Sequence, residues 1–102
     1  MYVMAVTTCP DKRTAKKIAD AILDKKLAAC VNIIPGITSK YWWKGKKEEG
    51  TEVVLFIKTR ERLVKKIGEL LKNEHPYELA ELIAMPLGGS KKYLDWIGSE
   101  TS

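Results

Sequence analysis

Apolar residues follow two different periods along the chain, and the periods alternate. Residues 2–8, YVMAVTT, form a short apolar run rich in β-prone side chains, which predicts a central strand. The following segment predicts a helix, since its apolar residues recur at i, i+3, i+4, i+7 and i+8: Ala15, Ile18, Ala19, Ile22 and Leu23. Asp11 precedes this helix and is a suitable N-cap, because its carboxylate can accept a first-turn N–H.

A long hairpin is predicted next. Residues 27–34, LAACVNII, indicate a second strand that is apolar on both faces. Pro35 and Gly36 interrupt it, and this pair favours a bend or bulge because proline donates no ladder hydrogen bond. The strand resumes through Trp43, residues 44–50 form a polar turn region, and residues 51–59 predict the third strand.

A second helix, a fourth strand and a terminal helix complete the pattern. Residues 60–74 predict a second helix with an apolar stripe of Leu63, Ile67, Leu70 and Leu71. Thr59 is a candidate N-cap of this helix, and Pro76 lies beyond its end. Residues 79–85 predict a strand that Pro86 closes. Residues 90–98 predict a short helix with Ser90 as its cap.

The order β-α-β-β-α-β limits the possible topologies. Strand–helix–strand units favour right-handed crossovers, and the hairpin makes the second and third strands antiparallel neighbours. The simplest solution is an α+β fold of the ferredoxin-like type: a four-stranded antiparallel sheet in the order 2-3-1-4, with both helices on one face and a C-terminal helix. The length of 102 residues suits a single domain over residues 1–102.

The segment KYWWKGK, residues 40–46, does not fit a lone subunit with this fold. Tyr41 and Trp43 point to one side of the strand and Trp42 to the other, because side chains alternate. Helices cover only one sheet face, and an exposed apolar edge strand invites pairing with another chain. We therefore expect a second copy of the protein against this hairpin. The alternative is a hairpin that folds back on its own sheet.

Charge adds one competing hypothesis. The formal net charge is +5, but the lysines are dispersed over the helices and the hairpin, which favours a solvated surface. A sheet with aromatic rings between lysines also resembles RNA-binding sheets, so a nucleic-acid module is the alternative function. No export signal or membrane span is visible, so we expect a cytoplasmic protein without a membrane partner.

The two cysteines have different expected roles. Cys30 lies within a strand, where a thiol is usually a small core residue, although thiolates also bind copper(I) and zinc. Cys9 precedes a helix N-terminus, which lowers a thiol pKa, so it is the better candidate for a reactive thiol. No CxxC or paired Cys/His spacing supports a structural zinc site.

One polar pocket is expected where the second helix gives way to the fourth strand. His75, the only histidine, stands there and is typical of a dipole partner at a helix end. It could converge with Tyr77, Trp42 and Lys58, and Lys58 either binds an anion or extends along the surface. Glu48, Glu49 and Glu52 are explained by a solvated turn. No catalytic motif is present, so we expect no enzyme; acid–base catalysis by His75 is the weakest alternative.

Five motifs occur in an order that resembles one family: TTCPD, LAACVNI, YWWKGK, IKTR and HPYELAELI. The chain resembles the CutA divalent-cation tolerance proteins nearly end to end. The resemblance implies a cytoplasmic homotrimer, joined by edge-strand pairing and similar in architecture to PII signalling proteins, with clefts at subunit junctions. It does not imply an enzyme.

The resemblance also implies ligands and site residues. Copper or another divalent metal, or a small anionic ligand, would bind at the subunit junctions. Cys30 would be a metal ligand and His75 would line the cleft as a second candidate ligand; the remaining cleft residues would be Tyr41, Trp42, Lys58 and Tyr77. One departure is Ala80, where many members have proline, so the approach to the fourth strand would be less rigid here.

Overall fold

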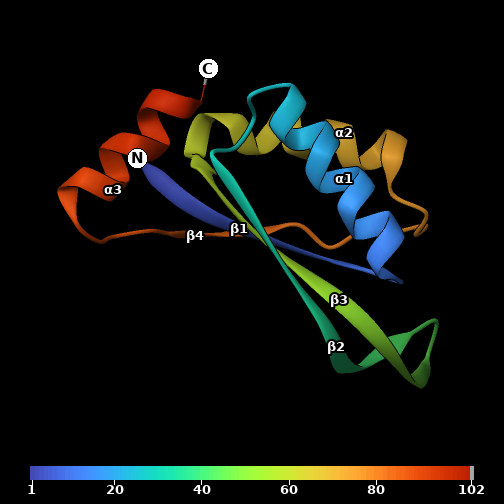
Figure 1. The fold of residues 1–102 in the computed structure, drawn as a ribbon. Helices are drawn as coiled ribbons and strands as arrows, with labels where there is room; N and C mark the ends of the chain where they lie inside the picture. The colour runs from blue at the N-terminus through green and yellow to red at the C-terminus, as the bar shows by residue number, and fades with distance from the viewer. Residues whose placement is uncertain (102) are drawn as a thin grey trace.

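The computed structural model describes residues 1–101 and places one antiparallel sheet at the centre of the chain (Figure 1). Its elements are β1 (Tyr2–Cys9), α1 (Lys12–Asp24), β2 (Cys30–Trp43), β3 (Lys46–Arg60), the 3-10 helix η1 (Glu61–Leu63), α2 (Val64–Glu74), β4 (Ile83–Pro86) and α3 (Lys91–Glu100). The strands lie in the order β2-β3-β1-β4, and every neighbouring pair is antiparallel. The predicted α+β topology is therefore confirmed.

The core lies between the sheet and the pair of helices α1 and α2. Alternate residues of β3, from Val53 to Thr59, are buried, as the two-residue period of a strand requires. The helices bury matching stripes against them: Ala15, Ile18, Ala19 and Ile22 from α1, and Ile67, Leu70 and Leu71 from α2. Leu23 was predicted to join the α1 stripe, but it is 39% exposed because it lies at the edge of the buried face.

The two predicted N-caps have different outcomes. Asp11 caps α1 as expected, since its Oδ1 accepts the backbone N–H of Thr14 at 2.8 Å, and this bond lowers the pKa of the Asp11 carboxyl. Thr59 was predicted to cap the second helix, and that prediction is wrong. Thr59 is buried within β3, where its hydroxyl donates to the carbonyl of Leu27 at 2.6 Å. The chain enters α2 through η1 instead.

The β2–β3 hairpin is longer and tighter than the sequence predicted. Residues 44–50 were expected to be a turn region, but the turn contains only Lys44 and Gly45, with φ values of 51° and 80°. Both are left-handed, as in the two-residue turns that match strand twist. The predicted bulge is confirmed between Ile34 and Ile37. The hairpin projects beyond the helices in Figure 1, and its tip lies close to the 76–81 segment of the same chain, where the Lys44 ammonium is 3.8 Å from Glu78.

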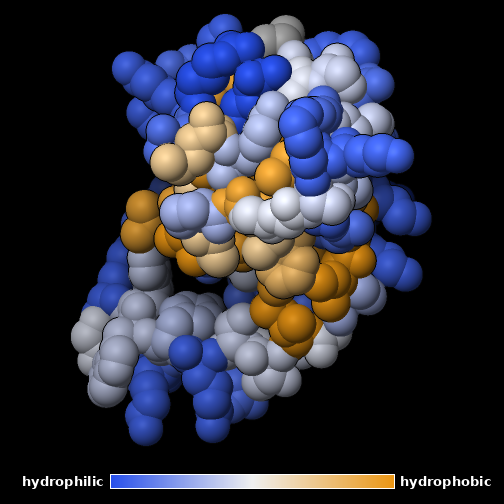
Figure 2. Space-filling model, turned by 90° about the vertical axis from the view of Figure 1, so that its left-hand side faces the viewer, coloured by the Kyte–Doolittle hydropathy of each residue, from blue (hydrophilic) through white to orange (hydrophobic). Residues whose placement is uncertain are grey.

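The sheet face opposite α1 and α2 is largely uncovered. β4 spans four residues, fewer than the predicted 79–85, and Ile83 and Met85 from it are 53% and 40% exposed. They lie opposite Val6 and Met4 of β1 in the register and so share this face. Figure 2 shows apolar side chains low on the body, on both sides of a hollow above the hairpin. An isolated subunit therefore exposes an apolar sheet face.

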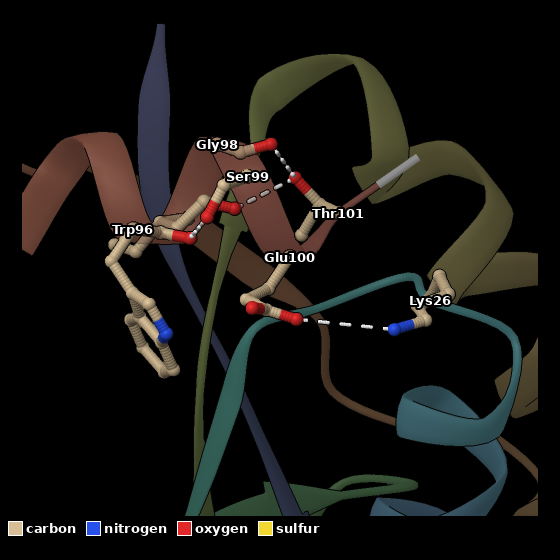
Figure 3. Close-up of polar contacts among 7 residues, drawn as sticks. Lys26, Trp96, Gly98, Ser99, Glu100 and Thr101 are labelled. Carbon is tan, nitrogen blue, oxygen red and sulfur yellow. Dashed lines mark hydrogen bonds and ion pairs between the residues drawn. The ribbon is translucent and has the colours of Figure 1, made fainter.

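α3 covers one end of that face. The Arg60 guanidinium holds the C-terminal end of this helix, since its Nη2 donates to the carbonyl of Gly98 at 2.8 Å and its Nε donates to Thr101 Oγ1 at 2.9 Å. Ser90 caps α3 as predicted, accepting the N–H of Tyr93 at 3.4 Å. Figure 3 shows Glu100 reaching Lys26, an ion pair of 3.9 Å that links α3 to the α1–β2 connection.

Candidate functional site

A cavity of about 890 Å³ lies between the projecting hairpin and the segment that leads from α2 to β4. The hollow above the hairpin in Figure 2 lies at this level. We call this cavity the hairpin pocket, and its lining residues are Thr8, Thr38, Ser39, Lys40, Tyr41, Trp42, Trp43, Glu52, Pro76, Tyr77, Glu78, Leu79 and Glu81. Three of the four predicted cleft residues, Tyr41, Trp42 and Tyr77, are therefore brought together by one chain.

Tyr77 and Glu52 join the two walls of the hairpin pocket. The Tyr77 hydroxyl donates to Glu52 Oε2 at 2.7 Å, which fixes the 76–81 segment against β3. Burial, together with the Glu52 carboxylate and the nearby Tyr41 hydroxyl, raises the pKa of Tyr77 above the usual range of a phenol. The phenol therefore stays protonated and remains a donor. Glu52 was expected to belong to a solvated turn, and its role was missed because its partner is 25 residues away.

His75 anchors the base of the same segment. It is 8% exposed, its Nε2 lies 2.7 Å from the carbonyl oxygen of Thr8, and its Nδ1 accepts the backbone N–H of Tyr77 at 3.2 Å. A carbonyl can only accept, so Nε2 carries the ring proton. Both ring nitrogens are thus engaged within the chain, and neither is free to bind a metal in this conformation. His75 positions the pocket segment and does not line the pocket.

The hairpin pocket carries more acidic than basic groups. Three glutamates line it, Glu52, Glu78 and Glu81, against the single lysine Lys40. The Lys40 ammonium lies 3.5 Å from Glu49 on the neighbouring strand. At the hairpin tip, the Lys44 ammonium lies 3.8 Å from Glu78. Such an electrostatic environment favours a cationic ligand over an anionic one.

Lys58 does not line the hairpin pocket of the single chain, and its place in a cleft between subunits stays a prediction. It lies opposite Cys30 in the β2–β3 register, and its ammonium lies 3.3 Å from the Tyr93 hydroxyl of α3. The same ammonium is 5.5 Å from the centre of the Tyr93 ring. The Lys58 ammonium therefore lies against the terminal helix α3. Sequence spacing could not reveal this, because the contact joins residues 35 positions apart.

The family assignment rests on the whole chain. Residues 3–100 match the model of the CutA1 divalent ion tolerance protein family. The chain belongs to this family. Among relatives, Protein CutA of Mus musculus is 51% identical over 98 residues, covering 95% of this chain and 55% of that protein. The divalent-cation tolerance protein CutA of Thermus thermophilus is 40% identical over 102 residues and 99% of each chain.

Solved CutA structures have the same fold. The Thermus thermophilus protein superposes with a TM-score of 0.97 over 100% of both chains, at 40% identity. The periplasmic divalent cation tolerance protein CutA of Archaeoglobus fulgidus superposes with a TM-score of 0.94 over 98% of both chains, also at 40% identity. The chain spans about 55% of the length of its mouse and human CutA relatives. The activities and partners of those longer proteins therefore remain proposals for this chain.

The cytoplasmic setting expected from the sequence is not supported. CutA relatives from rice and Arabidopsis thaliana are named chloroplastic, and the Archaeoglobus structure is described as periplasmic. Membership of the CutA family is thus compatible with several compartments and does not imply a cytoplasmic one. In residues 1–101, no helix is both long and apolar enough to cross a membrane.

The metal ligands predicted from the sequence are not gathered into one cluster in residues 1–101. Across residues 1–101, no three His, Cys, Asp or Glu side chains converge as a metal site would require. Cys30 is half-buried, and its Sγ lies 3.8 Å from Asn32 Oδ1. In the sheet register, Cys30 of β2 and Met4 of β1 both lie opposite Lys58 of β3. His75 contacts Thr8, which is four residues further along β1 than Met4, a distance of roughly 13 Å along the strand. The two predicted ligands are therefore not brought together within a subunit.

Cys9 is not the reactive thiol that its position before α1 suggested. Its side chain is fully buried at the end of β1, within the core cluster beneath the helices. Burial, with smaller contributions from the charges of Asp11 and Glu52, raises the pKa of the Cys9 thiol to about 11. Desolvation therefore outweighs the influence of the helix N-terminus, and the thiol stays protonated at neutral pH.

Proposed function

We propose that the protein is a ligand-responsive homotrimer of the CutA family, built like PII signalling proteins and without enzymatic activity. Its ligands would bind at the hairpin pocket, next to the surface where subunits meet. The observation that carries this proposal is the projecting hairpin with its exposed aromatics: Trp42 is 71% exposed and Tyr41 is 47% exposed. Large exposed rings beside an uncovered sheet face are typical of an interface with another chain.

Metal binding would require more than one subunit. A single chain offers Cys30 as a candidate ligand, but residues 1–101 contain no group of three His, Cys, Asp or Glu side chains that could hold a metal ion. Symmetry of a trimer would repeat Cys30 three times, and thiolates favour copper(I) and zinc. We therefore propose that copper or another divalent metal binds at the assembled junction. Equilibrium dialysis of wild type and Cys30→Ser with copper and zinc tests this, and equal metal content in both proteins would contradict it.

The assembly is tested by solution mass. Light scattering behind size exclusion should give about three times the chain mass of 11.5 kDa at two protein concentrations. Ile83→Glu places a charge on the uncovered sheet face, and Trp42→Glu places one on the hairpin, so both should release monomers. Leu23→Glu is the matched control, since Leu23 is also partly exposed but lies on α1. A monomeric wild type would contradict the proposal.

The nucleic-acid alternative is favoured by one observation only. Exposed Trp42 lies opposite Lys47 on the hairpin, which is the combination that single-stranded nucleic acid uses for stacking and charge. Lys40 and Lys44 on the same hairpin are instead paired with glutamates. The alternative predicts binding to single-stranded RNA that weakens steeply with salt. Absence of binding at low salt would exclude it.

A further inference from the structure

The rim of the hairpin pocket already holds an ammonium group. The Lys44 Nζ lies 5.6 Å from the centre of the Trp43 ring and 3.8 Å from Glu78 Oε1. Trp43 and Glu78 both line the pocket, one from the hairpin and one from the opposite wall. An ammonium within about 6 Å of an aromatic ring is attracted by the ring quadrupole. The protein's own lysine thus shows which chemistry this rim accepts.

Other residues that line the pocket also combine aromatic rings with carboxylates. Tyr41 and Tyr77 contribute further aromatic rings, and Glu52 and Glu81 contribute further carboxylates. Glu52 accepts a hydrogen bond from Tyr77 on one oxygen, Oε2. The volume of about 890 Å³ lies within the range of roughly 300–1,000 Å³ that small-molecule sites occupy. The pocket therefore has room for a small organic molecule next to its carboxylates and rings.

An organic cation fits this arrangement better than a bare metal ion does. The described residues contain no cluster of three acidic, histidine or cysteine side chains that could ligate one ion. Carboxylates that are spread around aromatic walls instead match a ligand with an apolar body and a positive charge. We propose that the hairpin pocket binds a small alkylammonium ion and that Lys44 competes with it for Trp43 and Glu78. This inference rests on the proposed ligand-binding role of the pocket.

The Lys44 ammonium is held only weakly, so a ligand that displaces it would also change how the hairpin tip is attached. The side chains of Lys44 and Glu78 are 69% and 70% exposed, so their ion pair is screened by solvent and easily displaced. An ammonium ligand that takes its place removes the Lys44–Glu78 link between the hairpin tip and the 76–81 segment. Ligand binding would thereby loosen the hairpin tip, which is the part of the chain proposed to meet another subunit.

A titration followed by nuclear magnetic resonance tests the ligand class. The probes are n-butylamine, which is protonated at neutral pH, its neutral analogue 1-butanol, and inorganic phosphate. The signals are the indole N–H resonances of the chain's three tryptophans; Trp42 and Trp43 report on the pocket, and Trp96 of α3 is the internal reference. We expect n-butylammonium alone to shift Trp43 saturably. Equal shifts with 1-butanol, shifts with phosphate only, or no shift would overturn the proposal.

Competition by Lys44 is tested with a matched pair of lysine variants. Lys44→Met should tighten n-butylammonium binding about two- to fivefold, the range that an exposed ion pair contributes. Lys47→Met removes the same charge from the same hairpin, but Lys47 lies opposite Trp42, whereas Lys44 is the lysine beside Trp43 and Glu78. The affinity of Lys47→Met for n-butylammonium should therefore stay at the wild-type value. Glu78→Gln should weaken binding. Equal affinities of Lys44→Met and Lys47→Met would overturn the competitor role.

Two outcomes separate this inference from the proposed assembly. The solution mass is measured on the samples used for the titration. A trimer whose Trp43 resonance ignores n-butylammonium would contradict the ligand class and leave the assembly intact. A monomer whose Trp43 resonance responds would contradict the assembly and leave the ligand class intact, since all pocket residues named here come from one chain.

Discussion

The Tyr77 hydroxyl donates a hydrogen bond of 2.7 Å to Glu52 Oε2 and so fastens the 76–81 segment to β3. His75 fastens the start of the same segment to the end of β1, through the carbonyl of Thr8. Two side chains that are two residues apart thereby set the position of one whole wall of the hairpin pocket. The wall has little regular structure of its own, since β4 begins only at Ile83.

Tyr77→Phe should destabilise the protein by about 1–2 kcal/mol. The change removes only the hydroxyl and leaves Glu52 without its donor. Hydrogen bonds to charged groups contribute about 1.5–3 kcal/mol, and the lower part of that range is expected because this bond is only partly buried. Urea denaturation of wild type and variant measures the difference. Tyr41→Phe is the control, because residues 1–101 show no hydrogen bond to the Tyr41 hydroxyl. Equal losses in both variants would show that the Tyr77–Glu52 bond is not the cause.

Stability should fall as pH rises from about 9 to about 11, and Cys9 should be one source. The Cys9 pKa is raised from 9.0 to about 11 in the fold. Over this window the unfolded chain loses the thiol proton while the folded chain keeps it. Stability is therefore fully present below pH 9 and declines by up to about 2–3 kcal/mol by pH 11. Denaturation midpoints from pH 8 to 11 measure the slope, and Cys9→Ala should flatten it.

The same burial predicts unequal reactivity of the two thiols. A chromogenic disulfide reagent at pH 8 should leave Cys9 unmodified in the folded protein and modify it in denaturant, because the nucleophile is the thiolate. The Cys30→Ser variant isolates Cys9 for this measurement. Rapid modification of Cys9 in that folded variant would contradict its assignment to the core.

Two helical glycines should respond oppositely to alanine. A Cβ at Gly98 would collide with the Tyr2 hydroxyl and approach Arg60 Nη2 to 2.9 Å. The Arg60 guanidinium cannot move away without losing its hydrogen bonds to Gly98 and Thr101, so Gly98→Ala should cost about 1–3 kcal/mol despite alanine's better helix propensity. At Gly68 the Cβ would meet only Leu82 Cδ2 at 3.3 Å, a movable side-chain end. Gly68→Ala should therefore leave stability unchanged or raise it by up to about 1 kcal/mol. Thermal unfolding compares the two variants.

Two hairpin glycines form a second matched pair. Gly45 has a φ of 80°, so Gly45→Ala should cost about 1–2 kcal/mol through backbone strain. Gly50 lies within β3 at negative φ, and a Cβ added there would meet nothing within 4 Å, so Gly50→Ala should stabilise by about 0.5 kcal/mol or more. Urea denaturation of both variants is the measurement, and a loss at Gly50 equal to that at Gly45 would contradict the turn geometry.

Local patterns predicted the elements because their causes are local. The stripe of α1 and its Asp11 cap depend on side chains within one or two turns, so residues 11–22 are enough to define them. The bulge at Pro35 and Gly36 has the same origin. Thr59 shows the limit: its sequence position suits a cap, but a partner 32 residues away, the carbonyl of Leu27, holds it inside the sheet.

The site was less predictable because its contacts join distant segments. Lys58 stands two residues from Phe56 on the uncovered sheet face, yet only the fold shows that Tyr93 lies beside it. Glu52 and Glu78 were missed as site residues because nothing in their neighbours distinguishes them from solvated glutamates. The pairing of aromatic rings with Lys44 at the hairpin tip was the one available signal, and the sequence alone did not say which carboxylate Lys44 would reach.

The bulge between Ile34 and Ile37 acts as a one-residue phase shift along β2. Before the bulge, even-numbered residues of β2 lie opposite even-numbered residues of β3, as Ile34 lies opposite Val54. After the bulge, odd-numbered residues of β2 lie opposite even-numbered residues of β3, as Ile37 lies opposite Glu52. Tyr41 and Trp43 therefore share the side of Glu52, and Trp42 takes the other. A chain shorter by one residue at this point would exchange these rings and turn Trp42 toward the glutamate. The spacing between two isoleucines thus decides which aromatic rings share the Glu52 side of the hairpin and which ring takes the opposite side.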